Sequence, residues 1–497
     1  MMSMSTFIST NTHQLPTETW TEIASYLPHA YQLPLLWVSR KFHDIALRFL
    51  FSAVKVYFVG EQFTTMFDIE SEEERDETIS GLMTKSWEIL HCIMHNPEFA
   101  GIVKSISVFA FADSLSVFEK MSLGQALLCL SDLRTFNWFG LEPAFSSSLF
   151  QCLPRSLQVL NVQSLPFRQE ASHLDSLHRL QVENLLYYRP WTQADQSSHA
   201  YFDNLLLLPS NTIPLVMEVS TTLRQLCILS YHLEEIPIHI YSSLTELEIC
   251  VPEDSNLIGM DLIFRHIPLL ESLSLVGCIT SDIFTILPQD PVSMQNLRSF
   301  RLSIDAVVLP VVSEEHVYVL SRFLGNQKKM RRLAIRLAGA YWGILCALLP
   351  TINSFEFLEV LGFHTGCENL SVEVATSLAS ILSPRLTSVY LAATWNNPDY
   401  AQTEITCLSP LLDKLKTLQR LTFFHLYGGY SGFPVVAEDL VAELEKLEVI
   451  GINRRMWDIM RKDSQSYELV EWKMWRSQFF IQEDFRYQDD AWLFKYH

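Results

Sequence analysis

Apolar residues recur along most of the chain in one short pattern. Each copy has an apolar residue, two variable positions, an apolar residue, one variable position and a last apolar residue. Clear copies start at Leu157, Leu177, Leu223, Leu244, Leu270, Leu297, Met330, Leu358, Leu386, Leu418 and Leu447. Weaker copies start at Val103 and Leu133. Because the side chains of a strand alternate between its two faces, the last two apolar residues of a copy share one face of a short strand.

The spacing of the copies predicts a repeat architecture. From Leu223 on, successive copies start 21 to 33 residues apart, and a period of about 20–29 residues is typical of leucine-rich repeats. Helical apolar spacing appears between copies, at Glu314–Asn326, Val372–Leu382 and Ala437–Lys446. One such strand cannot bury its apolar face alone, but a stack of strands builds a continuous core. We expect an α/β fold, a curved parallel β-α solenoid or horseshoe; the alternative is an ordinary α/β domain with leucine-rich strands.

One interval between copies is longer than the rest. The copies at Leu177 and Leu223 start 46 residues apart. This interval has room for a degenerate repeat around Asn204–Leu208, or for a loop that contains residues 189–199.

The N-terminal stretch Leu15–Phe51 lacks the repeat pattern and has helical spacing instead. Pro16 suits a helix start, and apolar residues follow at i, i+3, i+4 and i+7 from Trp20. A further helix is expected from Ser39. A unit of about 35 residues is too small to bury all of these apolar groups alone. Its surplus apolar surface therefore implies a partner, either the first repeat or another protein.

The same stretch resembles an F-box. LPTETWTEIASYLP followed by LLWVSRKFHDIALRFLF has the order of parts found in that family: Leu-Pro-x-Glu, an Ile, Leu-Pro, and Val-Ser-Arg before an aromatic residue. An F-box followed by leucine-rich repeats resembles the substrate receptors of SCF-type ubiquitin ligases. The resemblance implies that the unit binds the Skp adaptor of a cullin-RING ligase through Leu15, Pro16, Ile23, Leu27, Leu33, Leu36, Val38 and Phe42. The alternative is that the unit only caps the solenoid.

The repeat pattern also predicts which side chains line the concave face. Positions that flank the last two apolar residues of a copy face inward on the curved sheet. The candidate substrate-binding residues there are Arg301, Arg332, Arg336, His364, Tyr390, Arg420 and Phe424. The first three come from neighbouring copies, and strand spacing places them within about 15 Å of one another. Such a cluster could bind an acidic or phosphorylated segment; the alternative is surface charge that is solvated or paired with nearby acids.

Composition narrows the classes of partner. The chain has 497 residues, of which 48% are hydrophobic, and a formal net charge of −20. This apolar content is too high for a disordered chain, and the charge disfavours nucleic acid and anionic membrane surfaces as partners. The N-terminus lacks the features of a signal peptide, and the longest apolar run has 13 residues, whereas a membrane span needs about 20. We expect a soluble intracellular protein, cytoplasmic, nuclear or both.

No catalytic or metal-binding motif stands out. The nine cysteines include no C-x-x-C pair, which indicates a reducing compartment and no zinc ribbon. His91 and His95 share a helix face, but no acidic residue lies between them, so a surface or packed helix is expected rather than a metal site. The sequence therefore predicts no enzyme, no cofactor and no metal.

These observations give an expected domain order and function. We expect an F-box at 12–52, a connecting segment with an acidic insertion at 53–100, the repeat solenoid at 101–455, and a C-terminal cap or tail at 456–497. The resemblance implies a substrate-recognition adaptor of an SCF-type ligase, whose substrate is an unknown protein. The alternative is a repeat scaffold for protein–protein interaction outside any ligase.

Overall fold

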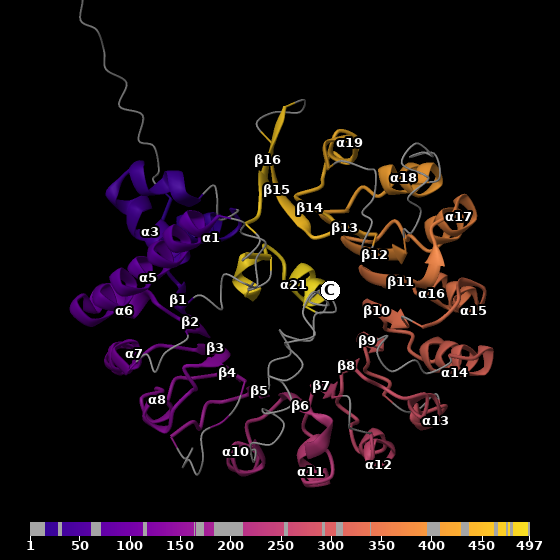
Figure 1. Cartoon of the computed structure of the whole chain (residues 1–497), viewed down its shortest axis with the longest axis horizontal. Coiled ribbons are helices and arrows are strands. Elements are labelled where there is room, and N and C mark those ends of the chain that lie inside the picture. Colours follow the sequence, from indigo (N-terminus) through magenta and orange to yellow (C-terminus); the bar gives the residue numbers. More distant parts are fainter. Residues whose placement is uncertain are drawn as a thin grey trace, which may run out of the picture.

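The computed structural model places strands on the inside and helices on the outside of a nearly closed ring (Figure 1). It describes residues 15–27, 32–60, 71–112, 117–163, 165, 173–182, 212–252, 257–290, 294–304, 312–337, 339–394, 408–428, 437–461, 466–473, 476–477 and 481–495. The expected degenerate repeat near 204–208 and the expected loop at 189–199 lie outside these residues.

One 16-stranded sheet runs through the described residues, with its strands in sequence order. The strands are β1 Ala53–Val59, β2 Ser105–Phe111, β3 Thr135–Glu142, β4 Val159–Val162, β5 Arg179–Val182, β6 Gln225–Leu229, β7 Glu246–Val251, β8 Ser272–Gly277, β9 Ser299–Ile304, β10 Arg332–Leu337, β11 Val360–Asn369, β12 Ser388–Thr394, β13 Phe423–Tyr427, β14 Val449–Ile452, β15 Arg455–Arg461 and β16 Tyr467–Glu471. Neighbouring strands from β1 to β14 pair in parallel, whereas β15 and β16 close the end of the sheet with antiparallel pairs.

The helices lie at three places: in the N-terminal unit, on the outer face of the sheet between repeat strands, and near the C-terminus. They are α1 Thr17–Ser25, η1 Leu33–Trp37, α3 Arg40–Leu50, α5 Glu72–His95, α6 Pro97–Ile102, α7 Val117–Cys129, α8 Ser147–Gln151, α10 Thr212–Glu218, η4 Ser230–His232, α11 Ile238–Tyr241, α12 Met260–Phe264, α13 Ile283–Ile286, α14 Glu314–Gly325, α15 Trp342–Leu345, η5 Cys346–Leu348, α16 Leu349–Asn353, α17 Val372–Ser380, α18 Ser409–Lys416 and α19 Ala437–Val441, with η9 Gln482–Asp484 and α21 Gln488–Phe494 near the C-terminus. Of the described helices, none is both long and apolar enough to cross a membrane.

The core lies between the sheet and the outer helices, and the repeat pattern builds it as expected. In the copy that contains β7, Leu244, Leu247 and Ile249 are all 0% exposed. Equivalent residues of the other repeats continue the same apolar cluster from β1 to β15. The expected leucine-rich-repeat-like β-α solenoid is therefore confirmed by the sheet topology.

The solenoid begins earlier than the sequence indicated. Strand β1 pairs with β2, so the ring includes part of the stretch 53–100, which was expected to be a connecting segment. Residues 72–77 of the expected acidic insertion at 68–77 are helical, and Ser71 caps α5 by accepting a hydrogen bond from the Glu74 backbone N–H. Acidic residues in a first helical turn are stabilised by the helix dipole, so this charge run is the start of a helix.

The repeat expected from Leu418 is out of register by three residues. Strand β13 begins at Phe423 and pairs Phe423 with Ser388 of β12. The copy therefore starts at Leu421, and Phe424 takes its second apolar position, where it is 0% exposed in the core. Arg420 precedes the strand and is exposed. The prediction that Arg420 and Phe424 line the concave face is wrong.

Candidate protein-interaction site

The N-terminal unit is a small helical assembly, as its apolar spacing predicts. Pro16 precedes α1, and Ser39 caps α3 by accepting a hydrogen bond from the Phe42 backbone N–H. The rings of Trp20 and Phe42 meet edge to face, with centroids 5.1 Å apart. The Gln32 side-chain amide donates to the Leu27 carbonyl oxygen at 2.9 Å, which ties η1 to the end of α1.

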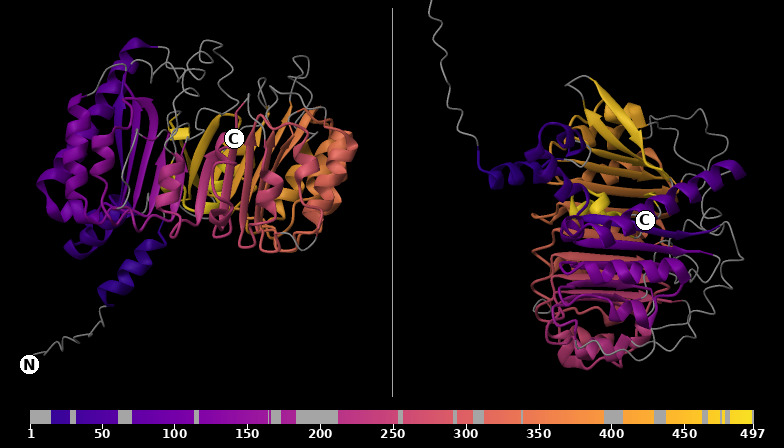
Figure 2. Two further views of the ribbon diagram at one scale, coloured as in Figure 1. Left: turned by 90° about the horizontal axis from the view of Figure 1, so that it is seen from below. Right: turned by 90° about the vertical axis from the view of Figure 1, so that its left-hand side faces the viewer.

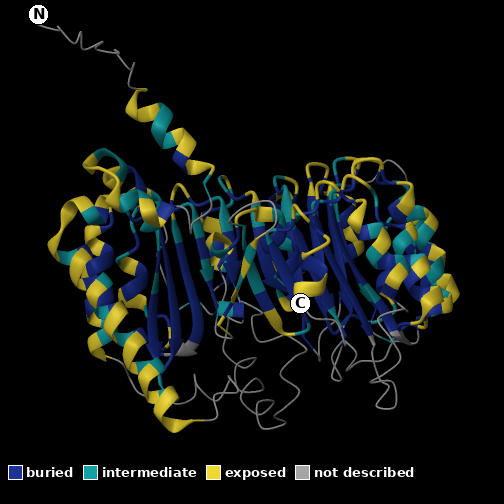
Figure 3. Cartoon of the chain, turned by 90° about the horizontal axis from the view of Figure 1, so that it is seen from above, coloured by how far each residue is buried: buried dark blue, intermediate teal, exposed yellow. Residues whose placement is uncertain are grey.

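The residues predicted to bind an adaptor remain accessible on this unit. Leu15, Pro16, Ile23, Leu33 and Val38 are exposed, whereas Leu27, Leu36 and Phe42 are half-buried. The helix nearest the N-terminus stands clear of the ring, and much of its surface is exposed (Figure 3). Since exposed apolar side chains that gather on one small unit are typical of a binding site, this surface is a candidate for docking a partner.

Two large apolar residues extend this surface beyond the predicted set. Trp37 is 89% exposed and Tyr26 is 71% exposed. Both were visible in the sequence, but helical spacing alone did not tell which aromatic residues face outward. Aromatic side chains with a polar tip often anchor protein interfaces, so Trp37 and Tyr26 belong with the candidate docking residues.

Part of the concave face is covered by the chain's own C-terminal segment, residues 481–495. Helix α21 lies inside the ring against β11 and β12 (Figures 1 and 2). The segment also reaches the first strands, since Ile481 packs with Tyr57, Phe109 and Phe139. Residues expected to form a C-terminal cap or tail therefore do both: β15 and β16 close the end of the sheet, and residues 481–495 lie across the repeats.

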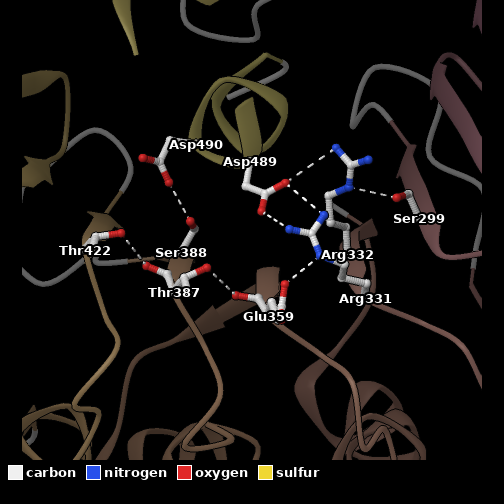
Figure 4. A network of polar contacts seen from close by, with 9 residues as sticks. All are labelled: Ser299, Arg331, Arg332, Glu359, Thr387, Ser388, Thr422, Asp489 and Asp490. Atoms are coloured by element: carbon white, nitrogen blue, oxygen red, sulfur yellow. Dashed lines mark hydrogen bonds and ion pairs between the residues drawn. The ribbon is translucent and has the colours of Figure 1, made fainter. Parts of the chain in front are cut away.

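Acidic residues at the start of α21 pair with basic residues at the start of β10. The Asp489 carboxylate accepts hydrogen bonds from Arg331 and lies 3.7 Å from the Arg332 guanidinium, and Arg331 also pairs with Glu359 at 2.5 Å (Figure 4). The Ser388 hydroxyl donates to the Asp490 carboxylate at 2.5 Å. The contact between the first turn of α21 and the inner sheet face is therefore largely charged or polar, and these directional bonds orient α21.

An apolar contact lies beside this network. Leu493 and Phe494 are 0% and 5% exposed, and they pack with residues of the inner sheet face that include Val360, Tyr390 and Phe423. Gly362 of β11 makes the approach possible, because a Cβ atom there would lie 2.9 Å from Leu493 Cδ1. Burial of two large side chains stabilises the docked segment by about 3–6 kcal/mol before the cost of ordering it.

Several predicted substrate-binding residues lie beneath this segment. Arg301 is 1% exposed; it donates a hydrogen bond to the Trp492 carbonyl oxygen, and its guanidinium lies 4.3 Å from the Trp492 ring centroid. Arg332 pairs with Asp489, and Tyr390 is 3% exposed. These side chains do face inward as predicted. However, the C-terminal segment of the same chain lies over them, at the position where a substrate was expected to bind.

The two remaining predicted residues, Arg336 and His364, are half-buried on the same face. Arg336 donates to the Ser303 hydroxyl at 3.5 Å, and the Gly366 backbone N–H donates to His364 Nδ1 at 2.9 Å. Burial, together with the nearby Arg336 charge, lowers the pKa of His364 to about 3. His364 is therefore neutral at pH 7 and cannot bind an anion by charge.

The C-terminal segment also joins the two ends of the ring. Asp484 pairs with Lys55 of β1 at 2.5 Å, while Arg486 pairs with Glu448, next to β14, at 2.7 Å. Arg486 also donates to the Tyr26 carbonyl oxygen at 3.5 Å. The segment thus connects the N-terminal unit, the first strand and the last parallel strand.

Comparisons with known proteins assign no family to this chain. No protein-family model matches the chain, and no curated protein matches it. Among solved structures, the chain is similar to the one titled as the crystal structure of a TLR13–ssRNA13 complex, with 14% sequence identity and a TM-score of 0.30. The match covers 70% of this chain and 48% of that chain, so this chain spans about half the length of its match.

Proposed function

We propose that this chain is a substrate receptor of an SCF-type ubiquitin ligase, and that residues 15–51 act as its F-box and bind the Skp adaptor. The observation that carries the proposal is the exposure of the apolar anchors that the F-box resemblance singles out. Leu15, Ile23, Leu33 and Val38 are 43%, 41%, 49% and 62% exposed. A free protein keeps such a cluster in water at a cost unless a partner covers it.

The unit is held at one end of the ring, which suits a receptor. Strand β1 starts three residues after α3 ends, so a bound adaptor would have a fixed position relative to the repeats. A receptor of this kind would contribute no catalytic residue. It would raise the effective concentration of a substrate near the ligase core, in the cytoplasm or the nucleus.

The substrate would reach the concave residues only after the C-terminal segment moves. Arg301, Arg332 and Tyr390 are covered by α21, so substrate binding there requires residues 488–495 to be displaced. Otherwise the substrate must bind elsewhere on the ring. Arg332 of the predicted arginine cluster already pairs with an acidic residue, Asp489, which supports an acidic segment as the class of substrate.

The alternative proposal is a repeat scaffold that works outside any ligase. Exposed apolar side chains on the outer helices favour it, because they offer other binding surfaces. Phe118, Met121 and Leu128 of α7 are 62%, 60% and 71% exposed. A scaffold would bind its partners through such residues and would not bind the Skp adaptor.

Co-expression with the Skp adaptor separates the two proposals. We expect the wild-type chain to form a stoichiometric complex, and the Ile23→Glu, Leu33→Glu variant to bind at least about 100-fold more weakly, since each buried leucine-sized side chain contributes about 1.5–3 kcal/mol. The matched control is Leu128→Glu, Leu262→Glu, which changes two exposed leucines on repeat helices. A folded wild-type chain that captures no adaptor would favour the scaffold.

A further inference from the structure

Three potential metal ligands meet on the concave face of β6 and β7. Cys227 of β6 stands opposite Glu248 of β7 in the sheet register, and Cys250 follows two residues later on the same face. All three are buried, with 6%, 5% and 0% exposure. Their ligand atoms lie within 4.8 Å of one another, and they form the one such His, Cys, Asp or Glu group in the described part of the chain.

The distances suit a shared ion better than a disulfide. Cys227 Sγ lies 3.9 Å from Cys250 Sγ, and it donates to Glu248 Oε1 at 2.9 Å. Two thiolates on one tetrahedral zinc ion, with bonds of about 2.3 Å, would be about 3.8 Å apart. By contrast, residues on neighbouring strands offset by two positions have Cα atoms about 8 Å apart, beyond the range of about 4.4–6.8 Å that a disulfide allows.

A positive charge already occupies this cluster. Lys495, which follows α21, places its Nζ atom 2.6 Å from Glu248 Oε1 and 3.4 Å from Gln181 Oε1. The ammonium group neutralises a carboxylate that would otherwise be buried at high cost. The three side chains therefore surround one positive charge, which in this structure is the Lys495 ammonium group.

We propose that Cys227, Glu248 and Cys250 form a binding site for a thiophilic divalent cation of the zinc class, in competition with the Lys495 ammonium. Two sulfur ligands select a soft or borderline ion over Mg²⁺ or Ca²⁺. Three protein ligands leave a fourth position open on a tetrahedral ion. The proposal is independent of the partner that the N-terminal unit binds.

Binding exchanges one set of charges for another. The two thiols lose their protons to solvent and become thiolates, Glu248 stays ionised, and the Lys495 ammonium leaves. Burial raises the pKa of the Cys227 thiol, with the neighbouring Cys250 and Glu248 adding to the effect. Because a metal binds the thiolate form of cysteine, ion binding releases thiol protons and is favoured by a higher pH.

Cobalt absorption tests the site directly in the full-length chain. We expect Co²⁺ to produce a sulfur-to-metal charge-transfer band that Zn²⁺ then bleaches, and we expect Cys227→Ser, Cys250→Ser to lose it. The matched control is Cys278→Ser, a thiol that is also buried, at 5% exposure. A band that persists at full intensity in the folded double variant, or no band in the wild-type chain, would overturn the proposal.

The competing lysine provides a test that does not depend on disturbing the core. Lys495→Ala removes the resident cation, and a charge-assisted hydrogen bond of this kind corresponds to about a tenfold or greater change in affinity. We expect Lys495→Ala to bind Co²⁺ at least about tenfold more tightly than the wild-type chain. Unchanged affinity would show that the ion does not enter the place of Lys495.

Discussion

Asp490 is an acid in surroundings that favour its protonated form. It is 2% exposed. Burial raises the pKa of its carboxyl group to about 7, Asp489 and Glu448 add to the rise, and the hydrogen bond from Ser388 opposes it. The Asp490 carboxyl group has a pKa of about 7 when α21 is docked and an ordinary value of 3.8 when it is not. Docking is therefore strongest below about pH 4 and weakens as the pH rises to about 7.

The prediction is that α21 is better protected from hydrogen exchange at pH 5 than at pH 8, after correction for intrinsic exchange rates. The difference in docking free energy would reach a few kcal/mol, since each pKa unit corresponds to about 1.4 kcal/mol. Asp490→Asn should remove most of this dependence. His425, whose pKa burial lowers to about 4, acts in the opposite direction, so the difference between wild type and variant is the quantity to measure. An equal pH dependence in both would contradict the account.

Gly362 tests the apolar half of the same contact. A Cβ atom there would lie 2.9 Å from Leu493 Cδ1 and 3.2 Å from Ala334 Cβ, so Gly362→Ala should displace the Leu493 side chain and weaken its packing less than a larger residue would. Gly362→Val should overpack the site by about 1–3 kcal/mol and raise the exchange rates of residues 489–494 about tenfold or more. A folded Gly362→Val chain with unchanged exchange would show that α21 does not depend on this approach.

The docking of α21 on β10 is a contact between two elements, and a double-mutant cycle measures it. Arg331→Ala and Asp489→Ala remove the two partners of the main ion pair. Because the Arg331 side chain is 40% exposed, solvent screens the pair, and we expect a coupling free energy of about 1 kcal/mol. Arg322→Ala on the outer helix α14, paired with Asp489→Ala, is the control, and this pair should be additive. A coupling near zero for Arg331 and Asp489 would mean that packing alone holds α21.

At this scale the sequence predicted most strands, placed one of them three residues too early and missed β1. The copies from Leu223 to Leu386 have the register that their apolar pattern predicts. At the copy near Leu418, both Leu418 and Leu421 can start the pattern, and only the pairing of Phe423 with Ser388 selects the second. Strand β1 was missed although Phe51, Val54 and Val56 fit the apolar pattern, because Phe51 is also the last residue of the stretch that resembles an F-box.

Across the whole molecule, the C-terminal segment closes the ring that the repeats leave open. Lys55 and Asp484 join the first strand to this segment, although they are 429 positions apart in the chain. No local sequence pattern predicts such a contact. Residues 481–495 contain no copy of the repeat, and the residues that they contact come from strands far apart in the sequence. The sequence therefore predicted correctly that Arg301, Arg332 and Arg336 face inward. It could not predict that Trp492 would cover Arg301 and that Asp489 would pair with Arg332.

The central claim is that residues 15–51 form an open docking surface, while the concave face is already occupied. Hydrogen exchange of the full-length chain, alone and with purified Skp adaptor, tests both halves in one measurement. The account predicts new protection at residues 15–51 on adaptor addition, and protection of residues 488–495 that is present before it and unchanged by it. No new protection at 15–51, or new protection confined to the inner strands, would contradict it.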